Sequence, residues 1–141
     1  MVELEEIGII HSPFKSRKEA PRTGGDEVFE IEIYEKYEKG LKDIQSFSHL
    51  HVIYWLHESK TNPLTVTTPW DSEPHGVFAT RSPDRPNSIG HSVVELLEVK
   101  NGILKVRGLD AIEGTPVLDL KPYDPDADAI PEANVGWFSK R

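Results

Sequence analysis

Residues 92–111 read SVVELLEVKNGILKVRGLDA, in which two β-rich runs are separated by Asn101 and Gly102. An Asn-Gly pair supplies the two residues of positive φ that a type I′ turn requires, and this turn joins adjacent antiparallel strands. The stretch therefore predicts a β-hairpin.

Further short strands are predicted on both sides of this hairpin. Residues 4–10 and 116–120 are strand-like runs, and Phe29, Ile31 and Ile33 alternate with glutamates. In HLHVIYWLH, residues 49–57, the even positions are apolar or aromatic and face the core, whereas three histidines share the odd face. Helical spacing over residues 34–44 predicts one short amphipathic helix, and residues 60–75 are expected to form a flexible loop. Because no βαβ alternation is present, the pattern favours a mainly β fold, an antiparallel barrel or a sandwich.

The composition is that of one soluble domain spanning residues 1–141. Sixteen Lys and Arg against twenty-four Asp and Glu give a net charge of -8, which argues against a general nucleic-acid coat but permits a local basic patch. The chain has no cysteine, so disulfides and thiolate sites are excluded. It shows neither a signal peptide nor an apolar run of about 20 residues, so we expect no membrane span and a cytoplasmic location.

The loop GVFATRSPDRPNSIGHS, residues 76–92, contains two arginines held near prolines. Residues before proline are extended, which applies to Ser82 and Arg85, and two prolines lower the cost of ordering the loop. The planar guanidinium of Arg81 or Arg85 suits a carboxylate or a phosphate. We interpret the loop as a rigid grip for an anionic ligand, the alternative being a stiff turn with solvated charges.

The histidines do not predict a metal site. Zinc needs three or four converging ligands, and His57 lies six residues beyond His51, on the order of 20 Å along an extended strand. A His49 and His51 pair would need ligands from elsewhere. The chain also lacks the nucleophile elbow, the H-E-x-x-H motif, the P-loop and the dinucleotide fingerprint. Three carboxylates lie around the IEGTP turn, Asp110, Glu113 and Asp119. They could hold a ribose or an amine, or they could simply be solvated.

Four ordered blocks resemble the tRNA threonylcarbamoyladenosine methyltransferase (TrmO) family. They are IGIIHSPFKSRKEAPRTGG, FSHLHVIYWLHES, GVFATRSPDRPNSIGHSVVEL and LDAIEGTPVLDLKPYDP, and they cover nearly the whole chain. The resemblance implies a single-sheeted antiparallel β-barrel with one or two short helices that binds S-adenosyl-L-methionine (SAM) without a Rossmann fold. It further implies a homodimer that methylates the modified adenosine next to the anticodon of tRNA. The chain looks like a short form without the C-terminal domain of bacterial members.

The same resemblance assigns site residues by motif. The family's usual Pro-Arg-Gln-Pro-Gly is Pro-Arg-Thr-Gly-Gly here, so Thr23 stands where the family has glutamine. A SAM sulfonium prefers oxygen acceptors to an arginine, so Arg81 is expected to face the methionine carboxylate or the RNA. The cofactor residues implied are Pro21, Arg22, Thr23, His57, Glu58, Arg81, His91, Ile112, Glu113, Gly114 and Thr115.

The substrate contacts and the catalytic base are less sharply indicated. Arg85 and Asn87 are the predicted substrate-binding residues. Arg85 lies further out in the loop than Arg81 and is expected to contact an RNA phosphate or to brace Asn87. A base that takes the proton from the attacking nitrogen would be one of Asp119, Lys121 and Tyr123 in the DLKPY run, and the sequence does not choose among them. Two alternatives stay open: a SAM-binding regulatory or interaction module without turnover, and a methyltransferase for a small molecule or a protein.

Overall fold

The computed structural model describes residues 1–16 and 25–140. The chain forms two compact units, one made of Met1–His57 and Ile89–Tyr123 and the other of Glu58–Ser88 and Asp124–Arg141. Each unit is described by itself below.

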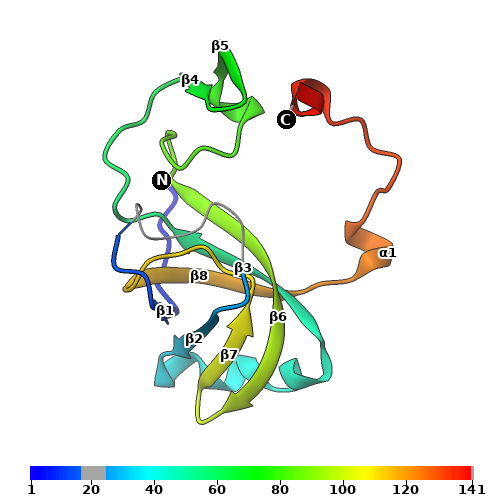
Figure 1. Ribbon diagram of the computed structural model, residues 1–141. Coiled ribbons are helices and arrows are strands. Elements are labelled where there is room, and N and C mark those ends of the chain that lie inside the picture. The colour runs from blue at the N-terminus through cyan, green and yellow to red at the C-terminus, as the bar shows by residue number, and fades with distance from the viewer. Residues whose placement is uncertain (17–24, 141) are drawn as a thin grey trace. The chain divides into compact units, whose positions relative to one another are not determined.

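The first unit is a closed antiparallel barrel (Figure 1). Its strand order is β1-β2-β7-β6-β3-β8, with β8 pairing back to β1. The mainly β class and the single-sheeted barrel are therefore confirmed. The strands are β1 (Gly8–His11), β2 (Val28–Ile33), β3 (His49–Trp55), β6 (Ile89–Lys100), β7 (Ile103–Arg107) and β8 (Thr115–Pro122).

The predicted hairpin is the β6-β7 pair. Lys100 lies opposite Ile103, and the turn residues Asn101 and Gly102 have φ values of 53° and 77°. These positive φ values are those of a type I′ turn, so the hairpin prediction is confirmed. A register shift between Leu96 and Glu98 bends β6, which is the longest strand of the barrel.

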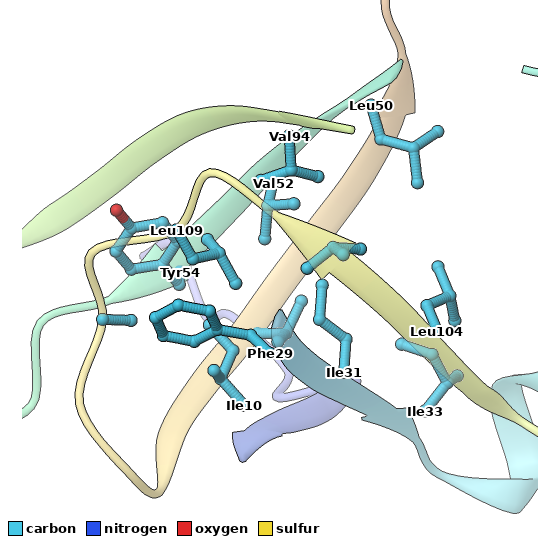
Figure 2. Close-up of a cluster of buried hydrophobic side chains, with 13 residues drawn as sticks. Ile10, Phe29, Ile31, Ile33, Leu50, Val52, Tyr54, Val94, Leu104 and Leu109 are labelled. Carbon is cyan, nitrogen blue, oxygen red and sulfur yellow. The ribbon is translucent and has the colours of Figure 1, made fainter. Parts of the chain in front are cut away.

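The alternation along β3 decides which side chains fill the barrel. Leu50, Val52 and Tyr54 are at most 3% exposed, and they pack with Phe29 and Ile31 of β2. Figure 2 shows these side chains converging between the strands. The predicted core face of residues 49–57 is thus confirmed, and the odd-numbered residues lie on the outer surface of the barrel.

Two local predictions were wrong, and for the first the reason is stereochemical. The amphipathic helix over residues 34–44 is two short 3₁₀ helices, η1 (Glu35–Leu41) and η2 (Ile44–Ser46), because Asp43 between them takes a left-handed φ of 70°. The first strand begins at Gly8 and not at residue 4. Ile7 still donates its backbone N–H to the Val117 carbonyl at 2.8 Å, which joins the entering chain to β8.

The second unit contains a β-hairpin, β4 (Thr65–Thr68) paired with β5 (Asp71–Gly76). Residues 60–75, expected to be a flexible loop, therefore include regular structure. Directly after β5, the chain forms the 3₁₀ helix η3 (Val77–Ala79). The unit ends with α1 (Pro125–Asp128) and the 3₁₀ helix η4 (Gly136–Lys140).

Within residues 1–16 and 25–140, no helix is long and apolar enough to cross a membrane.

Candidate functional site

Arg81 is exposed at the start of the loop that follows η3. The residues that bound this loop, Thr80 and Ser88, are 6% and 7% exposed, so both of its ends are anchored. The Thr80 hydroxyl donates to the Val77 carbonyl at 2.8 Å, and the Ser59 hydroxyl donates to the Asp84 carboxylate at 2.8 Å. The loop thus holds a fixed backbone while its first arginine faces solvent.

Arg85 has a different environment from Arg81. Its Nη1 donates to the carbonyl oxygens of Thr80 at 3.0 Å and Ser82 at 3.1 Å, the two residues that flank Arg81. Asn87, the other predicted substrate residue, is exposed. The arginine expected to contact an RNA phosphate or brace Asn87 therefore contacts the backbone of its own loop.

The C-terminal helix η4 contacts the residue before Thr80. The Trp137 indole N–H donates to the Ala79 carbonyl at 2.8 Å, and its ring stacks on His75 with centroids 3.9 Å apart and planes inclined by 7°. His75 in turn bonds Asp71 at 3.0 Å. Hydrogen bonds from the Glu73 backbone amide, then from His75 and Lys140, lower the pKa of Asp71 to about 2.

In the barrel unit, His91 and the three candidate bases lie on the outer surface of β6, β3 and β8. Ile53 of β3 lies opposite His91 on one side and Asp119 on the other. His91 stacks on His51, with ring centroids 5.0 Å apart and Nε2 of His91 2.8 Å from Nδ1 of His51. The register therefore brings this predicted cofactor residue close to a predicted base.

The other two candidate bases extend the same surface. Lys121 lies opposite His51 and its ammonium pairs with the Asp119 carboxylate at 3.2 Å. Tyr123 lies with its ring centroid 5.4 Å from that of His51. Lys121 and Tyr123 are thus neighbours of His51, and Asp119 pairs with Lys121, so the contacts leave all three as candidates.

The IEGTP turn holds the segment that follows β1. The Glu113 carboxylate accepts the Ser12 backbone N–H at 2.8 Å and bonds His11 Nδ1 at 3.1 Å, while Glu32 bonds the other ring nitrogen of His11 at 2.8 Å. The Glu113 amide also donates to the Phe14 carbonyl at 2.7 Å. This turn therefore fixes the backbone of residues 12–14.

The two carboxylates around His11 shift its titration. Hydrogen bonds to Glu32 and then to Glu113 raise the pKa of His11 above its usual 6.5. For Glu113, burial acts to raise the pKa, but the Ser12 amide and His11 outweigh it and the pKa is lowered. At neutral pH, His11 therefore has a larger charged fraction than a free histidine, and Glu113 is a carboxylate.

We expect His11→Gln to lower the free energy of unfolding by up to about 1 kcal/mol, since these side chains are partly exposed. Because the pKa of His11 is raised, its contribution is present below pH 6.5 and is lost as the pH rises through the raised value. The Glu113 contribution is lost as the pH falls through its lowered value. Urea unfolding from pH 4 to 9 checks this, with His49→Gln as control. If the loss of unfolding free energy in His11→Gln, relative to wild type, grows above pH 8, this prediction is contradicted.

The remaining predicted cofactor residues stand apart from these contacts. His57 and Glu58 are exposed just beyond the end of β3, and the His57 amide donates to the Trp55 carbonyl at 2.9 Å. Ile112 and Thr115 are buried within the turn. Pro21, Arg22 and Thr23 lie outside the described residues. In the part of the chain that is described, no group of three or more His, Cys, Asp or Glu side chains is arranged to hold a metal ion.

Sequence reasoning missed His11 and Trp137 as partners of site residues. His11 lies 102 residues from Glu113, and Trp137 lies 58 residues from Ala79, so no local pattern joins either pair. The one available signal for His11 was its place in the IGIIHSPF motif, which matches the family in the same way as the IEGTP turn.

The closed antiparallel barrel of the first unit defines the class of this protein as a small β-barrel protein. The chain belongs to the family described as the tRNA-methyltransferase O N-terminal domain, whose model matches residues 9–129. The predicted family is thereby confirmed.

Three relatives illustrate the similarity. A probable S-adenosyl-L-methionine-binding protein of Archaeoglobus fulgidus is 51% identical over 99% of this chain and 39% of its own length. The tRNA (adenine(37)-N6)-methyltransferase of Escherichia coli (strain K12) is 37% identical over 96% of this chain and 63% of its own. The crystal structure of TrmO from Pseudomonas aeruginosa superposes with a TM-score of 0.80 at 32% identity, covering 97% of this chain and 62% of that one. The chain thus spans less than two thirds of the length of these three relatives.

Proposed function

We propose that this protein is a SAM-dependent methyltransferase that acts on tRNA in the cytoplasm. Its substrate would be the threonylcarbamoyl-modified adenosine next to the anticodon. Support comes from the family match and from the E. coli relative, which is named for methylation of adenine 37 of tRNA. The observation that carries the proposal is Arg81, a cation exposed on an anchored loop. The match also covers residues of both units, which supports a single domain over residues 1–141.

The chain offers suitable groups for each part of SAM. Arg81 would bind the methionine carboxylate through a charge-assisted hydrogen bond. Glu113 accepts one hydrogen bond on each oxygen, and since a carboxylate has about four acceptor positions, it retains capacity for a ribose hydroxyl. The buried Ile112 would supply an apolar contact for the adenine. The proposed cofactor set is completed by Pro21, Arg22, Thr23, His57, Glu58, His91, Gly114 and Thr115.

Bound SAM would supply a methyl group on a sulfonium leaving group, and the chain's task is to align a nucleophile with it. Holding the attacking nitrogen in line contributes up to roughly 7 to 11 kcal/mol by proximity. The proton leaving that nitrogen needs an acceptor. Asp119 is the base we favour, because its carboxylate is 47% exposed and lies across Ile53 from His91. Lys121 would then keep Asp119 oriented, and Tyr123 is the alternative base.

RNA recognition has to be local, because the net charge of -8 opposes a polyanion. Asn87 is exposed beside Pro86 and is proposed to contact the RNA. A SAM-binding module without turnover is the second candidate, favoured by the name of the Archaeoglobus relative.

An assay with purified components tests the proposal. Calorimetry in the presence of a chelator is expected to show SAM binding near micromolar affinity or tighter, without added metal. Protein mixed with SAM and tRNA from cells lacking the gene is expected to yield a methylated threonylcarbamoyl nucleoside on digestion. Binding without methyl transfer would support the module instead, and absence of SAM binding by folded protein would contradict both.

We also propose that the functional unit is a homodimer formed by the outer face of β6 and β3. The barrel sheet is closed, so it offers no open edge for a partner to cover. The proposal therefore rests on an exposed apolar face of β6. Ile89, Val93 and Leu97 are 40%, 40% and 39% exposed and recur every fourth residue along the strand. A second copy presents the same face, as a two-fold interface requires.

Light scattering is expected to report about twice 15.9 kDa at micromolar concentration. Val93→Glu should shift the protein toward the monomer by placing a charge in the apolar face. Val28→Glu, at another exposed valine of the barrel unit, serves as the matched control. A wild-type monomer at all concentrations, or equal effects of both variants, would refute this interface.

A further inference from the structure

Three backbone carbonyls around Arg81 accept hydrogen bonds from side chains. The Ala79 carbonyl accepts from Trp137, and the Thr80 and Ser82 carbonyls accept from the single Nη1 of Arg85. The three distances lie between 2.8 and 3.1 Å. The carbonyls of both residues that flank Arg81 are therefore hydrogen-bonded to the Arg85 guanidinium. The Ala79 carbonyl, one residue further upstream, is hydrogen-bonded to the Trp137 indole.

Other contacts prevent this arrangement from shifting as a whole. The Ser82 amide donates to the Thr80 hydroxyl at 3.3 Å, and the Ser59 hydroxyl contacts both the Pro83 carbonyl and the Asp84 carboxylate. The Ser88 hydroxyl donates to the Arg85 carbonyl at 3.3 Å. Arg85 is thus held at its backbone as well as at its guanidinium.

Trp137 is in turn held by contacts of η4 with β5. Its ring stacks on His75, and the neighbouring Lys140 pairs with Asp71 at 3.3 Å. Asp71 and His75 both belong to β5, the strand that leads into η3 and the Arg81 loop. Trp137 itself lies beyond residues 9–129, the part of the chain that the family model matches.

We propose that Arg85 and Trp137 are positioning residues that fix the backbone on both sides of Arg81, so that its guanidinium is presented to the anionic group of the ligand. This inference rests on the proposed function, in which that group is the SAM carboxylate. It gives Arg85 a role within the protein where its sequence position suggested an RNA contact.

The physical reason is preorganisation. A guanidinium on a mobile loop has to be ordered when the ligand binds, and that loss of freedom reduces affinity. Carbonyls bonded by Arg85 and Trp137 have lost that freedom before the ligand arrives. The side chain of Arg81 is then the part that remains to be ordered.

Four variants separate this role from a direct contact. Arg85→Met removes the donors but keeps an apolar stem, and Arg85→Lys restores one nitrogen that can donate to both carbonyls. Trp137→Phe keeps a ring to stack on His75 but lacks the indole N–H. Ser139→Ala is the matched control on η4, since the Ser139 side chain is exposed and belongs to none of the contacts that hold Trp137.

The readout with ligand is SAM affinity by calorimetry. Arg85→Met and Trp137→Phe are each expected to weaken it about fivefold, the effect of one net hydrogen bond. Arg85→Lys and Ser139→Ala should stay within about twofold of wild type. In the Arg81→Ala background, Arg85→Met should cause no further loss, because it acts through Arg81. Additive losses in that double variant would overturn the proposal, since they would show a contact of Arg85 with SAM itself.

Binding of tRNA at two salt concentrations excludes the other role for Arg85. The salt slope is expected to be the same for wild type and Arg85→Met. A slope reduced by about 1 would show a phosphate contact and would overturn the positioning role.

Amide hydrogen exchange without ligand tests the arrangement independently of any activity. Exchange in residues 78–84 is expected to be about fivefold faster in Arg85→Met and in Trp137→Phe, with the barrel strands unchanged. Unchanged exchange would overturn the proposal even if SAM binds. If the wild-type protein binds no SAM, the proposed function is refuted. Faster exchange in Arg85→Met and Trp137→Phe would then still show that Arg85 and Trp137 fix the backbone around Arg81.

Discussion

Arg81→Ala is expected to weaken SAM binding at least about tenfold, the equivalent of about 1.4 kcal/mol. The guanidinium is exposed and its flanking carbonyls are fixed by Arg85, so the substitution removes a charge-assisted contact without leaving a buried group unpaired. Such contacts are typically worth about 1.5 to 3 kcal/mol. Calorimetric titration of the two proteins with SAM measures the effect.

Lys105→Ala is the control for the loss of one positive charge. Lys105 pairs with Glu98 on the β6-β7 hairpin, so its removal should leave SAM affinity within about twofold of wild type. Arg81→Lys should recover part of the affinity, because an ammonium keeps the charge but not the planar fork. An Arg81→Ala protein that binds SAM as tightly as wild type would remove Arg81 from the cofactor site.

Gly90→Ala is expected to lower the free energy of unfolding by about 1 to 3 kcal/mol, the usual effect of overpacking a filled core. A Cβ at Gly90 would lie 2.9 Å from two ring carbons of Tyr54 and closer still to a third. The ring cannot easily yield, because Tyr54 is 3% exposed and its hydroxyl bonds both Asp110 and Ser92 at 2.8 Å. Gly90 thus leaves space for the ring of the buried Tyr54. Urea denaturation measures the change.

Gly76→Ala is the matched control from the same sequence block. A Cβ at Gly76 meets no atom within 4 Å, and its φ of -56° suits any residue, so we expect a change within about 0.5 kcal/mol. Replacing Tyr54 with leucine in the Gly90→Ala protein should reduce the extra loss. Equal stability of the Gly76 and Gly90 variants would contradict this account of the motif.

Much of the barrel was predictable, because its signals are local. The Asn101-Gly102 turn and the two-residue alternation along residues 49–55 act over a few residues, and both gave the correct elements. Closure of the sheet was beyond such reasoning, since it depends on β8 returning to β1 more than a hundred residues away. The split helix depended on the left-handed conformation of Asp43, which an aspartate adopts only in certain contexts.

The candidate site also has features that could be predicted from the sequence and features that could not. Motif resemblance indicated which residues to consider, and the loop prolines indicated that Arg81 would be held in place. What each side chain contacts was not predictable: Arg85 turns back onto Thr80 and Ser82, and Glu113 is engaged by His11 and Ser12. These contacts join segments whose proximity is set by the folded chain and not by spacing in the sequence.

The most direct test of the central claim is the nucleoside profile of tRNA in cells. Bulk tRNA from cells with and without the gene would be digested and its nucleosides compared by mass spectrometry, with a strain carrying the Arg81→Ala variant as a third sample. SAM-dependent methylation of tRNA by this protein predicts that a methylated threonylcarbamoyl nucleoside disappears when the gene is absent and returns with the wild-type gene but poorly with the variant. An identical profile in all three samples would contradict the claim.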